Sequence, residues 1–200
     1  MSSDPAQSLP PRWLAFLQDV DNHLNSPVEL HCFGGFVLAA VYGLPRPTAD
    51  VDYIAAIPSD VLADLERIAG RGSALAEKRG LSFQYVTVAD VPEDYSERLT
   101  ELLPGQFFRL RLLALDVHDL VLAKLVRNSP VDLEDAKFLA NAGELNERIL
   151  KQRYERELRP NLSNETRHDL TLELWLEACF QMKRQRNESL QRRVKSRKKS

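Results

Sequence analysis

The sequence has few cysteines and no long hydrophobic run, and both shortages exclude classes of protein. Its 200 residues include two cysteines, Cys32 and Cys179, which lie far apart and outside any CxxC or Cys/His cluster. A disulfide framework or a structural zinc site is therefore not indicated. No apolar run approaches the roughly 20 residues of a membrane-spanning helix, and the start, MSSDPAQSLPPRW, lacks the apolar core of a signal peptide. We expect a cytoplasmic protein with no membrane segment.

Histidine metal motifs and serine-hydrolase motifs are missing as well. The four histidines are isolated from one another, and His23 has no histidine partner at i+4. Ser26, Ser59 and Ser73 lack the sequence context of a nucleophile elbow. The chemistry of this chain must therefore be sought in its acids, glycines and basic residues.

Charge is unevenly distributed along the chain, although the net charge is only −2. The segment 183–200, KRQRNESLQRRVKSRKKS, holds nine basic residues and one acidic residue, which leaves a net charge of −10 on residues 1–182. A segment of this composition cannot bury enough apolar surface to offset its chain entropy. We expect a disordered basic tail over 183–200, which either is simply solvated or contacts a nucleic acid such as RNA or tRNA.

Hydrophobic spacing predicts strands that alternate with helices, followed by helices alone. Strands are expected at 28–32, 51–57, 81–88 and 106–115, and helices at 12–24, 36–44, 59–72, 116–128 and 131–143. Ser59 and Asp116 are the expected N-caps of two of these helices, and residues 90–105 are expected to be helical or irregular. Two further helices should flank the break at Arg159-Pro160.

This order of elements predicts a mixed α/β (α+β) fold, with a small mixed β-sheet flanked by helices and a helical C-terminal lobe. We expect three parts: a sheet domain over 1–143, a helical extension over 144–182 and the basic tail over 183–200.

An Asp-x-Asp pair is the first chemical motif. Asp50 and Asp52 stand two residues apart in an expected strand, so their side chains project from the same face of the sheet. Carboxylate oxygens are suitable ligands for Mg²⁺, and two such groups can hold one or two ions. This pattern indicates a magnesium centre that moves a nucleotidyl group. The alternative is two surface acids on an exposed strand.

A glycine pair precedes this strand at a strand-to-helix turn. Gly34 and Gly35 would let backbone N–H groups approach a phosphate closely, and the N-terminus of the next helix adds a favourable dipole. Arg46 and Thr48 could contact a triphosphate by charge and by hydroxyl hydrogen bonding. The alternative for the glycines is an ordinary tight turn.

Together these motifs resemble the signature of the polymerase-beta-like nucleotidyltransferases: Gly34-Gly35, fourteen residues, then Asp50-x-Asp52. Within that superfamily, the segment DLVLAKLVRNSPVDLEDAKFL resembles the Lys…Asp segment of abortive-infection (AbiEii-type) toxin nucleotidyltransferases. The resemblance covers about residues 29–139. It implies a nucleotidyltransferase fold, an NTP substrate and, for a toxin, an antitoxin protein as partner.

The resemblance also implies roles for residues of the second half. It suggests Lys124 as a catalytic ligand of the nucleotide phosphates and Asp132 as a further catalytic acid, with Asp135 as the alternative. From the residues alone, Lys124 could equally be a solvent-facing lysine of an amphipathic helix. Asp132 could instead cap the next helix, with Asp135 in its first turn, where acids are favoured.

One departure from the family pattern affects the expected activity. Many polymerase-beta-like enzymes place a third carboxylate on a later strand, whereas FQYVTV and FFRLRLLAL contain no acid. The leading hypothesis is Mg²⁺-dependent transfer of an NMP from an NTP to an acceptor hydroxyl, such as an RNA or tRNA 3′ end. The alternatives are a nucleotide- or nucleic-acid-binding module that keeps the fold without turnover, and a nucleotidyltransferase that acts on a small molecule.

Overall fold

A five-stranded mixed sheet forms the centre of the molecule in a computed structural model, which describes the backbone of residues 9–197 and the side chains of residues 9–181. The strands are β1 (Val28–Phe33), β2 (Asp50–Ile57), β3 (Ser82–Tyr85), β4 (Thr100–Leu102) and β5 (Leu110–Ala114). Their order in the sheet is β3-β2-β1-β5-β4. Strand β1 runs antiparallel to β2 and parallel to β5, which confirms the predicted mixed sheet.

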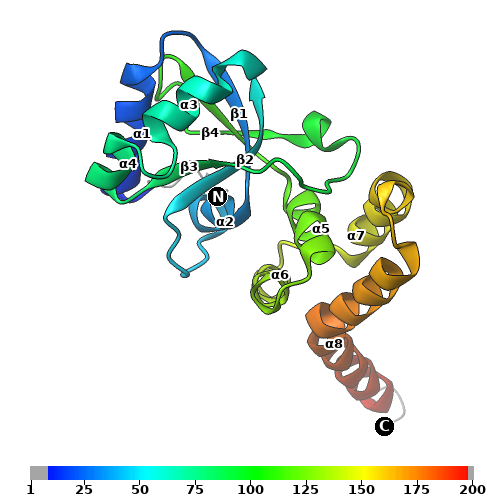
Figure 1. The fold of residues 1–200 in the computed structure, drawn as a ribbon. Coiled ribbons are helices and arrows are strands. Elements are labelled where there is room, and N and C mark those ends of the chain that lie inside the picture. Colours follow the sequence, from blue (N-terminus) through cyan, green and yellow to red (C-terminus); the bar gives the residue numbers. More distant parts are fainter. Residues whose placement is uncertain (1–8, 198–200) are drawn as a thin grey trace.

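Helices cover the sheet and then form a separate group at the C-terminal side. They are α1 (Pro11–His23), α2 (Gly34–Tyr42), α3 (Leu62–Ala69), α4 (Ala74–Arg79), α5 (Val117–Arg127), α6 (Pro130–Ala142), α7 (Glu147–Arg153) and α8 (Glu165–Arg197). Figure 1 shows α1, α3 and α4 on one side of the molecule and α5 to α8 on the other. The predicted succession of a sheet and a helical C-terminal lobe is confirmed.

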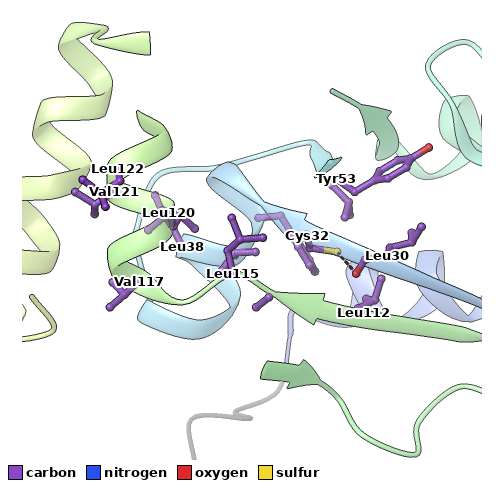
Figure 2. Packing of buried hydrophobic residues seen from close by; sticks show 14 of the residues in the cluster. Leu30, Cys32, Leu38, Tyr53, Leu112, Leu115, Val117, Leu120, Val121 and Leu122 are labelled. Carbon is purple, nitrogen blue, oxygen red and sulfur yellow. Dashed lines mark hydrogen bonds between the residues drawn. The ribbon is translucent and has the colours of Figure 1, made fainter. Parts of the chain in front are cut away.

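Part of the hydrophobic core lies around β1, the middle strand of the sheet, which is paired with β2 and β5. Leu30 and Cys32 of β1, Leu38 of α2 and Leu112 of β5 have no exposed surface, and Figure 2 shows Cys32, Leu30 and Leu112 along the paired strands and Leu38 beside Leu120 of α5. Both cysteines are buried free thiols. Burial also raises the pKa of the Cys32 thiol. The two strands that lead into α2 and α5 are therefore fixed by apolar packing.

Helix α1, which the sequence predicts over 12–24, packs on the sheet through its buried apolar residues, and Asp21 joins it to β5. The Asp21 carboxylate is buried and accepts hydrogen bonds from the backbone N–H groups of Phe108, Arg109 and Leu110 at 2.6–3.0 Å. Burial alone would raise the pKa of Asp21, but these backbone donors lower it. The start of β5 is thereby held at a fixed place.

Two local predictions are wrong. Ser59 does not cap α3, because a 3₁₀ turn (Ser59–Val61) intervenes and the Ser59 side chain makes no capping hydrogen bond. A strand, β4, forms inside the segment expected to be helical or irregular. A strand of three residues is too short to show an alternating pattern in the sequence. These residues form a strand because they pair with β5.

The C-terminal helix α8 continues to Arg197, so its backbone includes most of the segment predicted to be a disordered tail. The side chains from residue 182 onward lie outside the described part of the chain, as do residues 198–200 altogether. The domain boundaries and the role of the basic tail stay predictions. Over residues 9–197, no helix is both long enough and apolar enough to cross a membrane.

Candidate active site

The Asp-x-Asp pair lies at the start of β2, beside β3. Asp50 is paired in register with Ser82 and Asp52 with Gln84, so these four residues form two adjacent pairs on parallel strands. The Ser82 hydroxyl donates a hydrogen bond of 2.5 Å to Oδ1 of Asp50. The other carboxylate oxygen, Oδ2, lies 3.6 Å from a guanidinium nitrogen of Arg71. The Asp50 carboxylate therefore has a fixed orientation.

Asp52 has a raised proton affinity. Burial, followed by the negative charge of Asp50, raises the pKa of Asp52 to about 6, against the opposing effect of Arg127, Lys124 and Arg71. Two neighbouring carboxylates that repel each other in this way favour a divalent cation between them. The donor set thus fits Mg²⁺, which commonly takes one or two protein carboxylates and completes its coordination with phosphate and water.

Gly34 is required by the approach of Asp52. Its backbone has a φ of +74°, and a Cβ atom there would lie 2.4 Å from Oδ2 of Asp52. A Cβ on Gly35 would lie 3.3 Å from the hydroxyl of Thr48. Helix α2 begins at Gly34, and no side chain caps its N-terminus. Its first N–H groups are therefore available to an anion that binds next to Asp52.

A cleft of about 530 Å³ lies next to the Gly34-Gly35 turn. Six of the residues predicted from sequence line it, namely Gly34, Gly35, Arg46, Thr48, Asp52 and Lys124. Arg127 and Gln84 line it as well, together with Val86, Val88, Ala89 and Asp90, which follow β3. The structure thus gathers glycines, two acids and three cations from distant parts of the chain around one cavity.

Lys124 is held at this cleft by two buried acids. Its side chain is 5% exposed, and Nζ donates to Oδ1 of Asp132 at 3.1 Å and to Oδ2 of Asp135 at 2.9 Å. Burial excludes the alternative of a solvent-facing lysine. Arg127, one turn further along α5, donates to Asp132 at 2.8 Å.

Asp132 belongs to the first turn of α6. Ser129 is the N-cap of this helix, and Asp132 completes a capping box with it, so the alternative in which Asp132 itself is the cap is wrong. Burial would raise the pKa of Asp132, but hydrogen bonds from Arg127, Ser129 and Lys124 hold it well below its usual range. Asp132 is thus a fixed negative charge that orients two cations.

Asp135 holds a third cation. Arg46, from the loop before β2, donates to Oδ2 of Asp135 at 2.7 Å, so this acid connects the loop with Lys124. In the described part of the chain, no group of three or more histidine, cysteine or carboxylate side chains could hold a metal ion. Asp132 and Asp135 therefore contact the cations of the cleft and do not form a three-carboxylate cluster with Asp50 and Asp52.

Sequence reasoning missed Arg71, Ser82 and Gln84. Ser82 and Gln84 alternate along a predicted strand, so knowledge that this strand pairs with the Asp-x-Asp strand would have identified both. Arg71 lies in the Gly70-Arg71-Gly72 turn after α3, and no local signal marks it. Its position depends on the fold.

Comparison with models of protein families identifies a family for this chain. A family model described as "Nucleotidyltransferase of unknown function (DUF6036)" matches residues 14–184, a range that includes the whole cleft. The match supports the nucleotidyltransferase superfamily inferred from the glycine and aspartate motifs, and it does not single out the AbiEii-type branch. No curated protein and no solved structure matches the chain at a significant level.

Proposed function

Since the chain belongs to this family of nucleotidyltransferases, we propose that it transfers an NMP from an NTP to an acceptor hydroxyl with Mg²⁺ held by Asp50 and Asp52. One observation carries the proposal. The Asp52 carboxylate lies against Gly34, at the uncapped N-terminus of α2, so metal and phosphate would meet at one point.

The cleft residues would bind and orient the triphosphate. Backbone N–H groups of Gly34 and Gly35 would donate to phosphate oxygens, while Arg127 and Lys124 add positive charge from α5. Arg46 and Thr48 would act from the loop before β2. The Thr48 hydroxyl donates to the carbonyl oxygen of Asp50 at 3.3 Å, which links this loop to the metal-binding strand.

The reaction would be an in-line displacement. The acceptor oxygen forms a bond to the α-phosphorus, the bond from this phosphorus to pyrophosphate breaks, and the hydroxyl proton is released. When bound, Mg²⁺ would supply the charge that activates the hydroxyl and stabilises the departing pyrophosphate. Ser82 would keep Asp50 in the orientation that this role needs.

Label transfer tests the proposal. The purified protein is incubated with Mg²⁺ and each α-³²P NTP, with total RNA and tRNA as acceptors. We expect label in RNA, and we expect Asp50→Asn and Asp52→Asn to reduce transfer at least about 100-fold, because lost metal binding costs several kcal/mol of transition-state stabilisation. The matched control is Asp64→Asn, an exposed carboxylate of α3 that pairs with Arg67 away from the cleft.

Retention of transfer by Asp52→Asn would refute the assigned metal site. RNA as acceptor draws support from the basic composition of residues 183–200. The toxin role and the antitoxin partner draw support from the AbiEii-type resemblance alone. Growth arrest on expression of the wild-type chain, absent with Asp52→Asn, is the result that this role requires.

The second candidate is a binding module without turnover. The observation that favours it is the absence of a third carboxylate beside Asp50 and Asp52 among the described residues. Such a module would bind NTP in equilibrium dialysis and transfer no label to any acceptor, whereas the enzyme would do both.

A further inference from the structure

The Asp-x-Asp pair on β2 has different neighbours toward β1 and toward β3. Strand β2 lies between β1 and β3 in the sheet. The glycine turn follows β1, and the helix with Lys124 and Arg127 follows β5, so these phosphate-binding groups come from the β1 side of β2, whereas Arg46 and Thr48 lie in the loop that leads into β2. On the other side lies β3, which places Ser82 next to Asp50, and Gln84, which also lines the cleft, next to Asp52. A hydroxyl acceptor needs a place on this second side, opposite the departing pyrophosphate.

Arg71 is a cation that lies on the β3 side of the Asp-x-Asp pair. Its Nη2 donates to Oε1 of Gln84 at 3.2 Å and lies 3.6 Å from Oδ2 of Asp50, which is beyond ordinary hydrogen-bond distance. The side chain is 76% exposed. A guanidinium carries five N–H donors, so most of them are left for a ligand.

The backbone at Arg71 is fixed, although the side chain is exposed. Gly70 forms a parallel bridge with Phe83 of β3, and the N–H of Ser73 donates to the carbonyl oxygen of Gly70 at 3.0 Å. A Cβ on Gly70 would lie 2.4 Å from the backbone oxygen of Glu66, so the turn packs tightly against α3. The guanidinium is thus presented from a constrained turn.

We propose that Arg71 binds a phosphate group of the acceptor, and that the acceptor is a phosphate-bearing molecule whose hydroxyl reacts beside Asp50. This inference rests on the proposed function. A guanidinium pairs with phosphate through two parallel N–H donors, and its charge opposes the binding of a polycationic acceptor. An RNA strand and a phosphorylated small molecule share this chemistry, so the experiment has an arm for each.

The test compares Arg71→Gln with Arg67→Gln. Arg67 is the matched control because it is an exposed arginine of α3 that pairs with Asp64, outside the cleft. The acceptors are an oligoribonucleotide, ribose 5-phosphate and uncharged ribose. We expect Arg71→Gln to raise the KM of a phosphate-bearing acceptor about 10-fold, because a charge-assisted hydrogen bond is lost. The KM of the NTP should stay within about twofold, and Arg71→Lys should restore part of the acceptor KM.

Three outcomes overturn the inference while leaving the proposed function intact: equal acceptor KM in both glutamine variants, an equal rise in the KM of the NTP, or transfer to uncharged ribose as efficient as transfer to the best phosphate-bearing acceptor. Preference between the oligoribonucleotide and ribose 5-phosphate identifies the source of the phosphate. If the wild type transfers no label to any acceptor, the proposed function fails. Fluorescence anisotropy with a labelled oligoribonucleotide then tests Arg71 alone: weaker binding only in Arg71→Gln supports the contact, and equal binding refutes it.

Discussion

The protonation of Asp52 makes the stability of the protein depend on pH. Burial and the charge of Asp50 raise the pKa of Asp52 in the folded protein to about 6, well above the ordinary value of an aspartic acid. The folded state therefore binds this proton more tightly than the unfolded chain does. The resulting stabilisation is fully present below the unfolded pKa, and it is lost as the pH rises through about 6. At neutral pH the ionised carboxylate lowers the stability of the metal-free protein.

Removal of this charge should stabilise the protein at neutral pH. We expect Asp52→Asn to raise Tm at pH 7.5 by about 2–8 °C, which corresponds to about 1–2 kcal/mol for a chain of this size. The gain should shrink as the pH falls to 4.5, because the wild-type carboxyl is then protonated in the fold. Differential scanning calorimetry in metal-free buffer across this pH range measures it.

The control is Asp64→Asn, whose carboxylate is half exposed on α3 and pairs with an exposed arginine. Its Tm difference from the wild type should be small at both pH values. A lower Tm for Asp52→Asn at pH 7.5, or a gain that does not depend on pH, would contradict the assigned cause.

At the scale of elements, the N-terminus of α6 is held together with the cations of α5. Asp132 has no exposed side-chain surface and accepts hydrogen bonds from Lys124, Arg127 and Ser129. One carboxylate therefore completes the capping box of α6 and pairs with two cations. The sequence alternative placed Asp132 itself at the cap, whereas Ser129 is the N-cap, and the contact with Lys124 depends on how α5 and α6 pack.

Substitution of Asp132 should lower the free energy of unfolding far more than substitution of the N-cap residue, Ser129. We expect Asp132→Ala to lower the free energy of unfolding by about 3–5 kcal/mol, because Lys124 stays buried with one partner fewer. Ser129→Ala should cost about 1 kcal/mol, the usual value of an N-cap. Urea unfolding followed by circular dichroism measures both.

Lys137→Ala is the control on the same helix, since its ion pair with Glu134 is exposed and should contribute less than 1 kcal/mol. The explanation given for Asp132 fails if Asp132→Ala and Ser129→Ala prove equally stable.

For the whole molecule, a buried ion-pair group joins the sheet region to the helical lobe. Asp119 of α5 is completely buried and accepts from Arg98, in the turn before β4, at 2.9 and 3.1 Å, and from Arg153 of α7 at 2.9 Å. Arg98 also donates to Glu157 at 2.6 Å. A single apolar cluster extends from Leu9 to Phe180 through both regions. These contacts favour one cooperative unit across the predicted boundary at residue 143.

The two tryptophans can test this cooperativity. Trp13 lies in α1 and Trp175 in α8, so Trp175→Phe leaves a probe of the sheet region and Trp13→Phe leaves a probe of the helical lobe. We expect both probes to show the same urea midpoint. Arg98→Met should lower the free energy of unfolding by about 3 kcal/mol, whichever tryptophan is the probe, because Asp119 and Glu157 lose a partner.

Arg111→Met is the control, because Arg111 makes exposed ion pairs with Glu29 and Glu101 that should contribute little. Fluorescence midpoints that differ between the two probes would show that the helical lobe unfolds separately, which contradicts a single cooperative unit.

Local patterns accounted for much of the fold and of the site. Helix α1, the N-cap of α5 and the extent of α6 up to residue 143 were predicted because each depends on residues within one or two turns of one another. Strand β4 and the 3₁₀ turn at Ser59 were not predicted. Both depend on neighbours that are remote in sequence or on the exact entry into a helix.

The sequence by itself determined which groups are present and how near neighbours are oriented: the glycine turn, two acids on one strand face, and a lysine and arginine one helical turn apart. Backbone geometry and side-chain periodicity set these relations. Only the tertiary structure decided that Arg71 and Ser82 contact Asp50, and that Arg46 pairs with Asp135, 89 residues away. Such contacts follow from strand order and helix packing, which arise from burial of the whole apolar surface and leave no local pattern in the sequence.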